Sequence, residues 1–152
     1  MKVRVEIDEH LQQPEVVIRT AGDDPNIEKI KQLLANTPLS NETLSGFKNS
    51  TEYFLKPESI LFIETENRQL QIHTADDIYT SKERLYEIAT KLPAYFMQVA
   101  KSTIVNLNQI NALNKSISNC LISFYDSHKE VYASRRYYKQ LQERLNEMRL
   151  LK

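Results

Sequence analysis

Polar and apolar residues alternate near the amino terminus of the chain, and the same period of two recurs over most of its length. Residues 2–8 (KVRVEID) and 15–21 (EVVIRTA) therefore predict two half-buried strands. A helix is predicted next, because 23–25 (DDP) supplies an N-cap and an early proline before apolar residues at helical spacing over 27–34. This ββα unit, residues 1–41, is too small for its own core. We expect it to pack on the rest of the chain or on a second copy.

Short β-runs dominate the remainder of the chain, beyond a polar, turn-rich boundary at 36–50. Strands are predicted at residues 51–55, 59–65, 68–74, 75–81, 95–99, 103–107, 109–115, 119–125 and 130–134. Thr80 and Glu83 form a capping-box pattern that begins an internal helix ending before Pro93. The segment 134–152 predicts a final helix with an apolar face of Tyr138, Leu141, Leu145 and Met148. The fold class expected is mostly β (α+β), a domain over 45–147 with one internal and one C-terminal helix.

Composition excludes several classes of function. With two glycines among 152 residues the chain has no phosphate-binding loop, so a nucleotide-hydrolysing or dinucleotide enzyme is not expected. The single cysteine, Cys120, and three scattered histidines lack metal-ligand spacing, so no metal or other cofactor is expected. We predict no enzyme and no small-molecule substrate.

Charge and hydropathy indicate the compartment and a partner. No signal peptide or apolar run of about 20 residues is seen, and a single cysteine fits a reducing compartment, which predicts a cytoplasmic protein. The net charge is zero, but residues 129–152 hold seven basic and three acidic side chains. That basic end permits a local site for a polyanion.

Three segments, in this order and spacing, resemble the LytTR-type DNA-binding domain of bacterial transcription regulators. They are SILFIET (59–65), FMQVAKSTIVNLNQI (96–110) and VYASRRYYKQL (131–141). The resemblance covers roughly residues 45–147 and implies an elongated, mostly antiparallel β fold. It also implies that loops, and no recognition helix, read successive major grooves of double-stranded DNA. The segment before residue 45 lacks the pattern of a receiver domain, so we expect a stand-alone regulator.

The resemblance also implies which residues contact DNA: one position in the loop after 59–65, one in the AKS turn at 100–102 and one at the end of the last strand. The candidate DNA-binding residues at and beside these positions are Arg68, Lys101, Ser102, Arg135, Arg136 and Lys139. Arginine bonds bidentately to guanine, and lysine neutralises phosphate. We expect Lys101, Ser102 and Lys139 to fix the register on the DNA backbone. Asn106, by contrast, is expected to satisfy backbone groups near a turn.

Alternative interpretations remain for the same residues. Arg135 and Arg136 are either solvated or bound to an anion, because cations are unfavourable at a helix start. Gln98 and Ala100 stand where the family often has Arg and His, which thins the basic cluster.

Three hypotheses about the function therefore remain. The first is a regulator that binds repeated half-sites as a homodimer, with residues 1–41 as the dimerisation or regulatory unit. Similar short family members are often controlled by a membrane protein, so a regulatory membrane partner is part of that expectation. The alternative is a protein-interaction module on a LytTR-like scaffold with a decayed DNA surface. A small-molecule sensor using the N-terminal unit is a third, although the sequence shows no ligand constellation.

Overall fold

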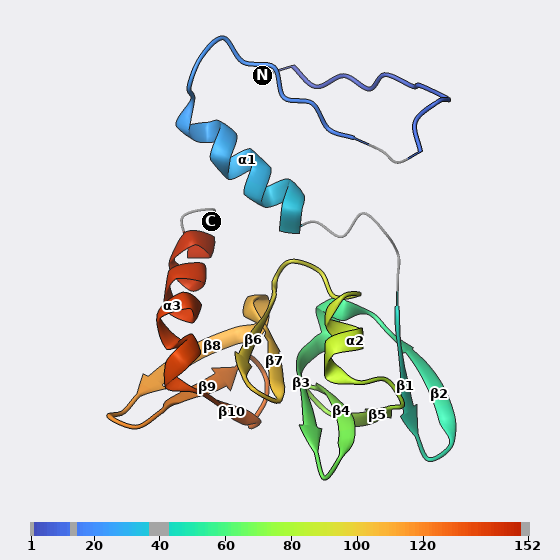
Figure 1. Ribbon diagram of the computed structural model, residues 1–152, viewed down its shortest axis with the longest axis vertical. Helices are drawn as coiled ribbons and strands as arrows, with labels where there is room; N and C mark the ends of the chain where they lie inside the picture. The colour runs from blue at the N-terminus through green and yellow to red at the C-terminus, as the bar shows by residue number, and fades with distance from the viewer. Residues whose placement is uncertain (1, 13–14, 37–42, 150–152) are drawn as a thin grey trace.

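The computed structural model describes residues 2–12, 15–36 and 43–149 (Figure 1). The helices are α1 (Pro25–Asn36), α2 (Leu85–Ala89) and α3 (Arg135–Arg149), with short 3-10 helices at Pro57–Ser59 and Leu107–Gln109. The strands are β1 (Leu44–Lys48), β2 (Thr51–Leu55), β3 (Ile60–Glu66), β4 (Gln69–Thr74), β5 (Ile78–Ser81), β6 (Phe96–Ala100), β7 (Thr103–Asn106), β8 (Ile110–Lys115), β9 (Cys120–Phe124) and β10 (Glu130–Ala133).

All strand pairs are antiparallel and form two sheets. The larger sheet has seven strands in the order β2-β1-β5-β4-β3-β7-β6, and the smaller has three in the order β10-β9-β8. The nine predicted strands beyond residue 50 match β2 to β10 within three residues at each end. The prediction of a mostly β, α+β fold with one internal and one C-terminal helix is confirmed. β1 lies in the segment predicted to be a turn-rich boundary, and it pairs with β2 and β5.

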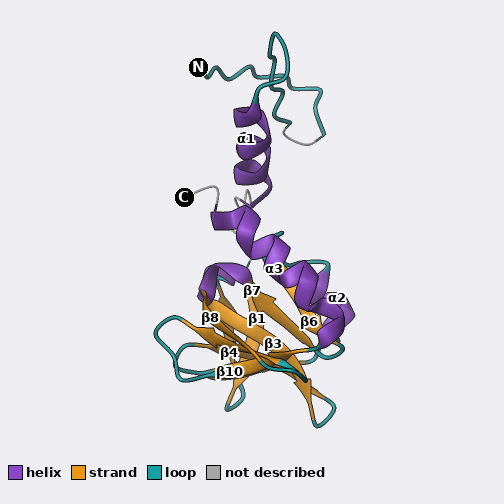
Figure 2. Ribbon diagram, turned by 90° about the vertical axis from the view of Figure 1, so that its left-hand side faces the viewer, coloured by secondary structure: helices purple, strands orange, loops and turns teal. Residues whose placement is uncertain are grey.

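The predicted N-terminal ββα unit is wrong in its strands and right in its helix. Residues 2–8 and 15–21 carry no strand, and the apolar face of the first segment is open, with Val3 and Ile7 84% and 90% exposed. A pair of strands alone is marginal in water, and among the described residues no strand of either sheet pairs with residues 2–8 or 15–21. Helix α1 begins as predicted, with the Asp24 carboxylate accepting from the Asn26 backbone N–H at 2.9 Å. Both views show α1 away from the sheets (Figures 1 and 2).

Two hydrophobic clusters lie on opposite faces of the central strands, because successive strand residues point to opposite sides. One cluster joins the larger sheet to the smaller sheet and α3; its buried members are Leu61, Phe62, Met97, Val99, Val105, Leu107, Cys120, Ile122, Phe124, Val131, Ala133 and Leu141. The other lies under α2; its buried members are Leu44, Leu55, Ile60, Ile63, Leu70, Ile72, Tyr79, Ile88, Tyr95, Phe96 and Ile104. Strands β3 and β7 are thus buried on both faces over Ile60–Ile63 and Thr103–Asn106, which explains the unbroken apolar run ILFI at the start of β3.

Helix α3 packs on the first cluster through the predicted apolar face. Leu141 is fully buried, and Tyr138, Leu145 and Met148 pack against the cluster. Helix α2 begins at Leu85 and not at the predicted capping box, because Thr80 belongs to β5, where its hydroxyl donates to the Phe47 carbonyl at 3.3 Å.

Asn106 joins the ends of two strands, as the sequence predicted. Its side chain is fully buried, and Nδ2 donates to the Ile60 carbonyl at 2.9 Å. Its Oδ1 accepts from the Asn108 backbone N–H at 3.0 Å and caps the short 3-10 helix. The amide therefore satisfies backbone groups of β3 and of the turn after β7.

Candidate nucleic-acid interface

Arg68 lies at the tip of the β3–β4 hairpin. Asn67 and Arg68 form its two-residue turn with φ of 52° and 64°, and Glu66 pairs with Gln69 below them. Positive φ at both turn residues matches the right-handed twist of the flanking strands, as in a type I′ hairpin. The Arg68 side chain is exposed, so the turn presents a guanidinium to solvent.

Lys101 and Ser102 form the β6–β7 turn, and both side chains are exposed. The turn is held from two sides. The Ser102 carbonyl accepts from the Thr65 backbone N–H of β3 at 2.9 Å. The Gln98 side-chain amide donates to the carbonyls of Ala100 and Lys101 at 3.1 and 3.3 Å. Gln98, which stands where the family often has arginine, therefore braces this turn.

Arg135 and Arg136 lie at the β10–α3 junction, where both side chains are exposed. The Ser134 backbone N–H donates to the Val99 carbonyl at 2.8 Å, which ties the junction to β6. The Arg136 guanidinium lies 5.6 Å from the Tyr137 ring centroid, a cation–π contact that orients it. Lys139 is exposed one helical turn further on and shares a face with Arg135 and Arg136.

Two backbone hydrogen bonds bring these loops together. The bond from Thr65 to Ser102 places the end of β3, next to the Arg68 turn, beside the Lys101 turn. The bond from Ser134 to Val99 places the Arg135–Arg136 junction beside the other arm of that turn. The three predicted contact positions thus follow one another along one end of the two sheets, with Lys101 in the middle. Within the described ranges, the ion pairs involve none of the five candidate cations.

Lys129 belongs to the basic end of the sequence but has a structural role. Its half-buried ammonium donates to the carbonyls of Thr74 and Asp77 at 2.9 and 2.8 Å, and burial lowers its pKa. The Asp77 carboxylate in turn pairs with Lys48. These contacts join the β9–β10 loop to the β4–β5 turn. No local sequence signal distinguishes Lys129 from the exposed basic residues that follow it.

His73 and Glu64 lie side by side on neighbouring strands below the Arg68 turn. His73 is 6% exposed and stacks on Phe62 with ring centroids 4.2 Å apart. Burial, and to a smaller extent the positive charge of Lys129, lowers the pKa of His73 to about 4. Burial, and to a smaller extent the negative charge of Glu66, raises the pKa of Glu64. His73 is therefore uncharged at neutral pH, and its 3.1 Å approach to the Glu64 carboxylate is not an ion pair.

Among the described residues, no group of three or more His, Cys, Asp or Glu side chains is placed to hold a metal ion. The described helices include none that is long and apolar enough to cross a membrane.

Comparison with known proteins gives one family and a set of relatives. The model of the LytTr DNA-binding domain matches residues 50–146. An uncharacterized HTH-type transcriptional regulator of Staphylococcus aureus (strain NCTC 8325 / PS 47) is 28% identical over 148 residues, covering 96% of this chain and 99% of the relative. A protein of the same description from strain N315 is 32% identical over 108 residues, covering 70% of this chain and 72% of the relative.

A solved structure has the same fold. It is the LytTr DNA-binding domain of a Bacillus cereus protein described as a methyl-accepting/DNA response regulator. The TM-score is 0.63 at 20% identity, and the match covers 68% of this chain and 96% of the other. The names of the Staphylococcus relatives refer to a helix-turn-helix, in which two helices follow one another. In the described residues of this chain, strands separate α1, α2 and α3.

Proposed function

Since this chain belongs to the LytTR family of DNA-binding domains, we propose that it is a sequence-specific transcriptional regulator that reads major grooves of double-stranded DNA with loops. The observation that carries the proposal is the row of exposed cations on three loops that backbone hydrogen bonds hold together. Because hydrogen bonds fix the loops before binding, little conformational entropy is lost when they meet DNA.

Each cation has a role that follows from its position. Arg68 at a hairpin tip and Arg136 at a helix start are the arginines that read guanine edges. Lys101, Ser102 and Lys139 contact phosphates and set the register, since compact ammonium and hydroxyl groups bind phosphate without selecting a base. Arg135 lies next to Arg136 and adds positive charge at the same junction.

We further propose that residues 1–41 form a dimerisation or regulatory unit and that the protein binds repeated half-sites as a homodimer. Support comes from the exposed apolar face of residues 2–8, which a strand from a second copy would cover. A cytoplasmic location and control by a membrane protein complete the proposal; they rest on composition and on the resemblance to short family members.

Selection from a pool of random duplex DNA at about 150 mM salt tests this function. We expect an enriched motif, repeated at a spacing of roughly one helical turn if a dimer binds. Binding to that motif will be lost in Arg136→Ala and weakened in Lys101→Ala, while both variants keep the wild-type unfolding temperature. Lys56→Ala is the matched control, because Lys56 is exposed beside the opposite end of β3. Wild-type affinity in both interface variants would remove these residues from the site.

A protein-interaction module is the second candidate, and two observations favour it. Gln98 is occupied in bracing its own turn, and the acidic Glu66 lies beside the Arg68 turn. This candidate predicts no enriched motif from a folded protein, and any DNA association that responds only weakly to salt. Binding through phosphates instead weakens steeply as salt rises.

A further inference from the structure

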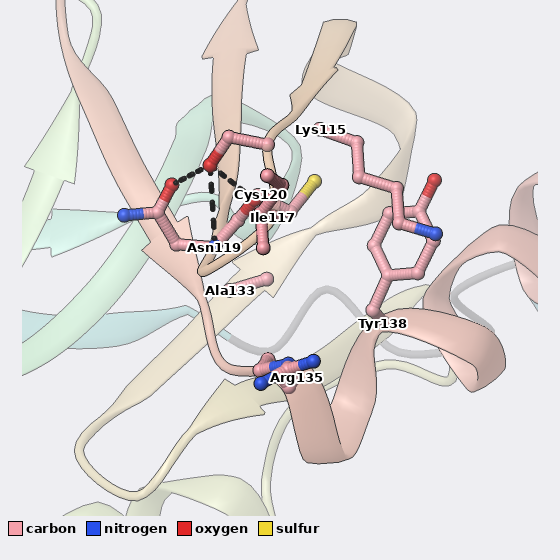
Figure 3. A pocket seen from close by; sticks show the side chains of 8 residues that line it. Lys115, Ile117, Asn119, Cys120, Ala133, Arg135 and Tyr138 are labelled. Atoms are coloured by element: carbon pink, nitrogen blue, oxygen red, sulfur yellow. Dashed lines mark hydrogen bonds between the residues drawn. The ribbon is translucent and has the colours of Figure 1, made fainter.

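A pocket of about 170 Å³ lies beside the proposed interface, between the β8–β9 turn and the start of α3 (Figure 3). Its lining residues are Lys115, Ser116, Ile117, Asn119, Cys120, Ala133, Arg135 and Tyr138. A water molecule takes about 30 Å³ of the liquid, so the space accommodates a group the size of a phosphate. Cys120 and Ala133 pair across β9 and β10, which brings the turn against the β10–α3 junction.

The charge around this pocket has one sign. Lys115 and Arg135 line it, no carboxylate does, and neither cation is in an ion pair with any described residue. Lys115 is held over the Tyr138 ring, with Nζ 4.2 Å from the centroid. Its charge also reaches Cys120, where it opposes the effect of burial, which raises the pKa of that thiol.

Hydrogen bonds between Ser116 and Asn119 close the β8–β9 turn that follows Lys115. The Ser116 backbone N–H donates to the Asn119 carbonyl at 2.8 Å, and the Ser116 hydroxyl donates to Asn119 Oδ1 at 2.8 Å. Figure 3 shows side-chain hydrogen bonds at Asn119 on one side of the pocket, with Lys115 directed toward Tyr138 on the other. The Lys115 ammonium is therefore positioned before any ligand arrives.

The pocket also continues the row of loops. Along that row the Arg68 turn, the Lys101 turn and the Arg135–Arg136 junction follow one another, and the β8–β9 turn lies next in line through the Cys120–Ala133 pair. Cations at a helix start are unfavourable without an anion, and α3 begins at Arg135. An anion between Lys115 and Arg135 would remove that conflict.

We propose that this pocket binds one phosphate of the DNA backbone, with Lys115 and Arg135 as its donors, and that it extends the interface beyond the three loops to the β8–β9 turn. The proposal rests on the proposed DNA-binding function and adds Lys115 to the interface. Because both donors would contact a phosphate and no base, the contact raises affinity for every sequence alike.

The test is Lys115→Gln in the full chain, measured against its selected motif and a random duplex over a series of salt concentrations. Loss of one whole phosphate contact lowers the slope of log affinity against log salt by about 0.9, which is about fivefold in affinity at 150 mM salt. Lys115→Gln leaves Arg135 at the phosphate and should lose part of this amount. We expect this loss on both duplexes, whereas Arg136→Ala loses the motif selectively. Lys56→Gln carries the same chemical change on an exposed lysine at the far end of β3 and should behave as wild type.

A scan of single methylphosphonate substitutions identifies the phosphate. One neutral linkage should weaken the wild type about fivefold and Lys115→Gln by less, since that variant has already lost one of the two donors to this phosphate. Unchanged affinity and salt slope in Lys115→Gln, with the wild type binding its motif, overturn the proposal and leave the proposed function standing. Absence of any salt-dependent DNA binding by the wild type overturns both. Inorganic phosphate that shifts the Ser116 and Arg135 amide signals, without any effect of Lys115→Gln on DNA, overturns the assignment to DNA.

Discussion

Asn106 offers the sharpest test of how the scaffold beneath the interface is held. Replacing it with leucine keeps the number and branching of the side-chain heavy atoms but removes both side-chain hydrogen bonds. The Ile60 carbonyl then lacks its amide partner in a fully buried region, at a cost of about 1–3 kcal/mol. The Asn108 N–H is only partly buried, so its loss adds about 1 kcal/mol. We expect the free energy of unfolding to fall by about 2–4 kcal/mol.

The variant Asn106→Asp tests the two side-chain hydrogen bonds of Asn106 independently. Aspartate keeps an acceptor for the Asn108 N–H but places a carboxylate oxygen against the Ile60 carbonyl, where Nδ2 lies at 2.9 Å. Burial raises the pKa of such an acid above its unfolded value, so the penalty is largest at pH 7. It shrinks as the pH falls through the folded-state pKa, where the protonated acid can donate to Ile60.

Urea unfolding followed by far-UV circular dichroism measures both variants. Asn114→Leu is the control, because Asn114 is exposed on β8, and we expect it within about 0.5 kcal/mol of wild type. A free energy of unfolding of Asn106→Leu within that same margin of wild type would refute the reasoning, since the buried bond to Ile60 could not then be joining β3 to β7.

Three further predictions concern polar and tightly packed positions. His73→Phe should remove a pH dependence of the free energy of unfolding. In the wild type, His73 takes up a proton on unfolding between its folded pKa of about 4 and the ordinary value of 6.5. The free energy of unfolding of the wild type should therefore fall by about 3 kcal/mol as the pH falls through that window, and that of the variant should not. Gly46→Ala should destabilise by about 1–3 kcal/mol, because a Cβ would lie 2.8 Å from atoms of Leu55 and Tyr79, while Gly22→Ala meets nothing within 4 Å and should not destabilise. Lys129→Met should lower stability by about 1–2 kcal/mol through loss of two hydrogen bonds, and leave the salt dependence of DNA binding unchanged.

Denaturant unfolding at several pH values, thermal unfolding of the two glycine variants and a salt titration on DNA check these in turn. Parallel pH profiles for wild type and His73→Phe would show that another group is responsible. Equal unfolding temperatures for the two glycine variants would contradict the close packing inferred around Gly46 in β1. A reduced salt slope in Lys129→Met would make that lysine part of the interface.

The order of the strands along the chain could be predicted from local pattern, because a half-buried or fully buried strand leaves its period in the sequence. The structural role of Asn106 followed in the same way, since a lone amide in an apolar run must find backbone partners. The candidate cations could be proposed only through the three motifs and their family resemblance, because an exposed arginine has no local pattern of its own.

Contacts between residues distant in sequence decided which segments form strands and which lysine has a structural role. Residues 2–8 have an ideal alternation and form no strand, whereas β1, with glycine and serine in LSGFK, is a strand because β2 and β5 lie on either side of it. Lys129 differs from its basic neighbours only because two carbonyls of the β4–β5 region surround its ammonium.

For the proposed interface, too, the sequence determined some features and the tertiary structure determined others. The sequence alone determined which loops carry cations and that their neighbours are apolar strands. Their alignment in one row, and the pocket beside Lys115, depend on the Thr65–Ser102 and Ser134–Val99 bonds and on the pairing of Cys120 with Ala133. Hydrogen bonds between backbones far apart in the chain carry no side-chain signature, so only the tertiary structure could decide which loops meet.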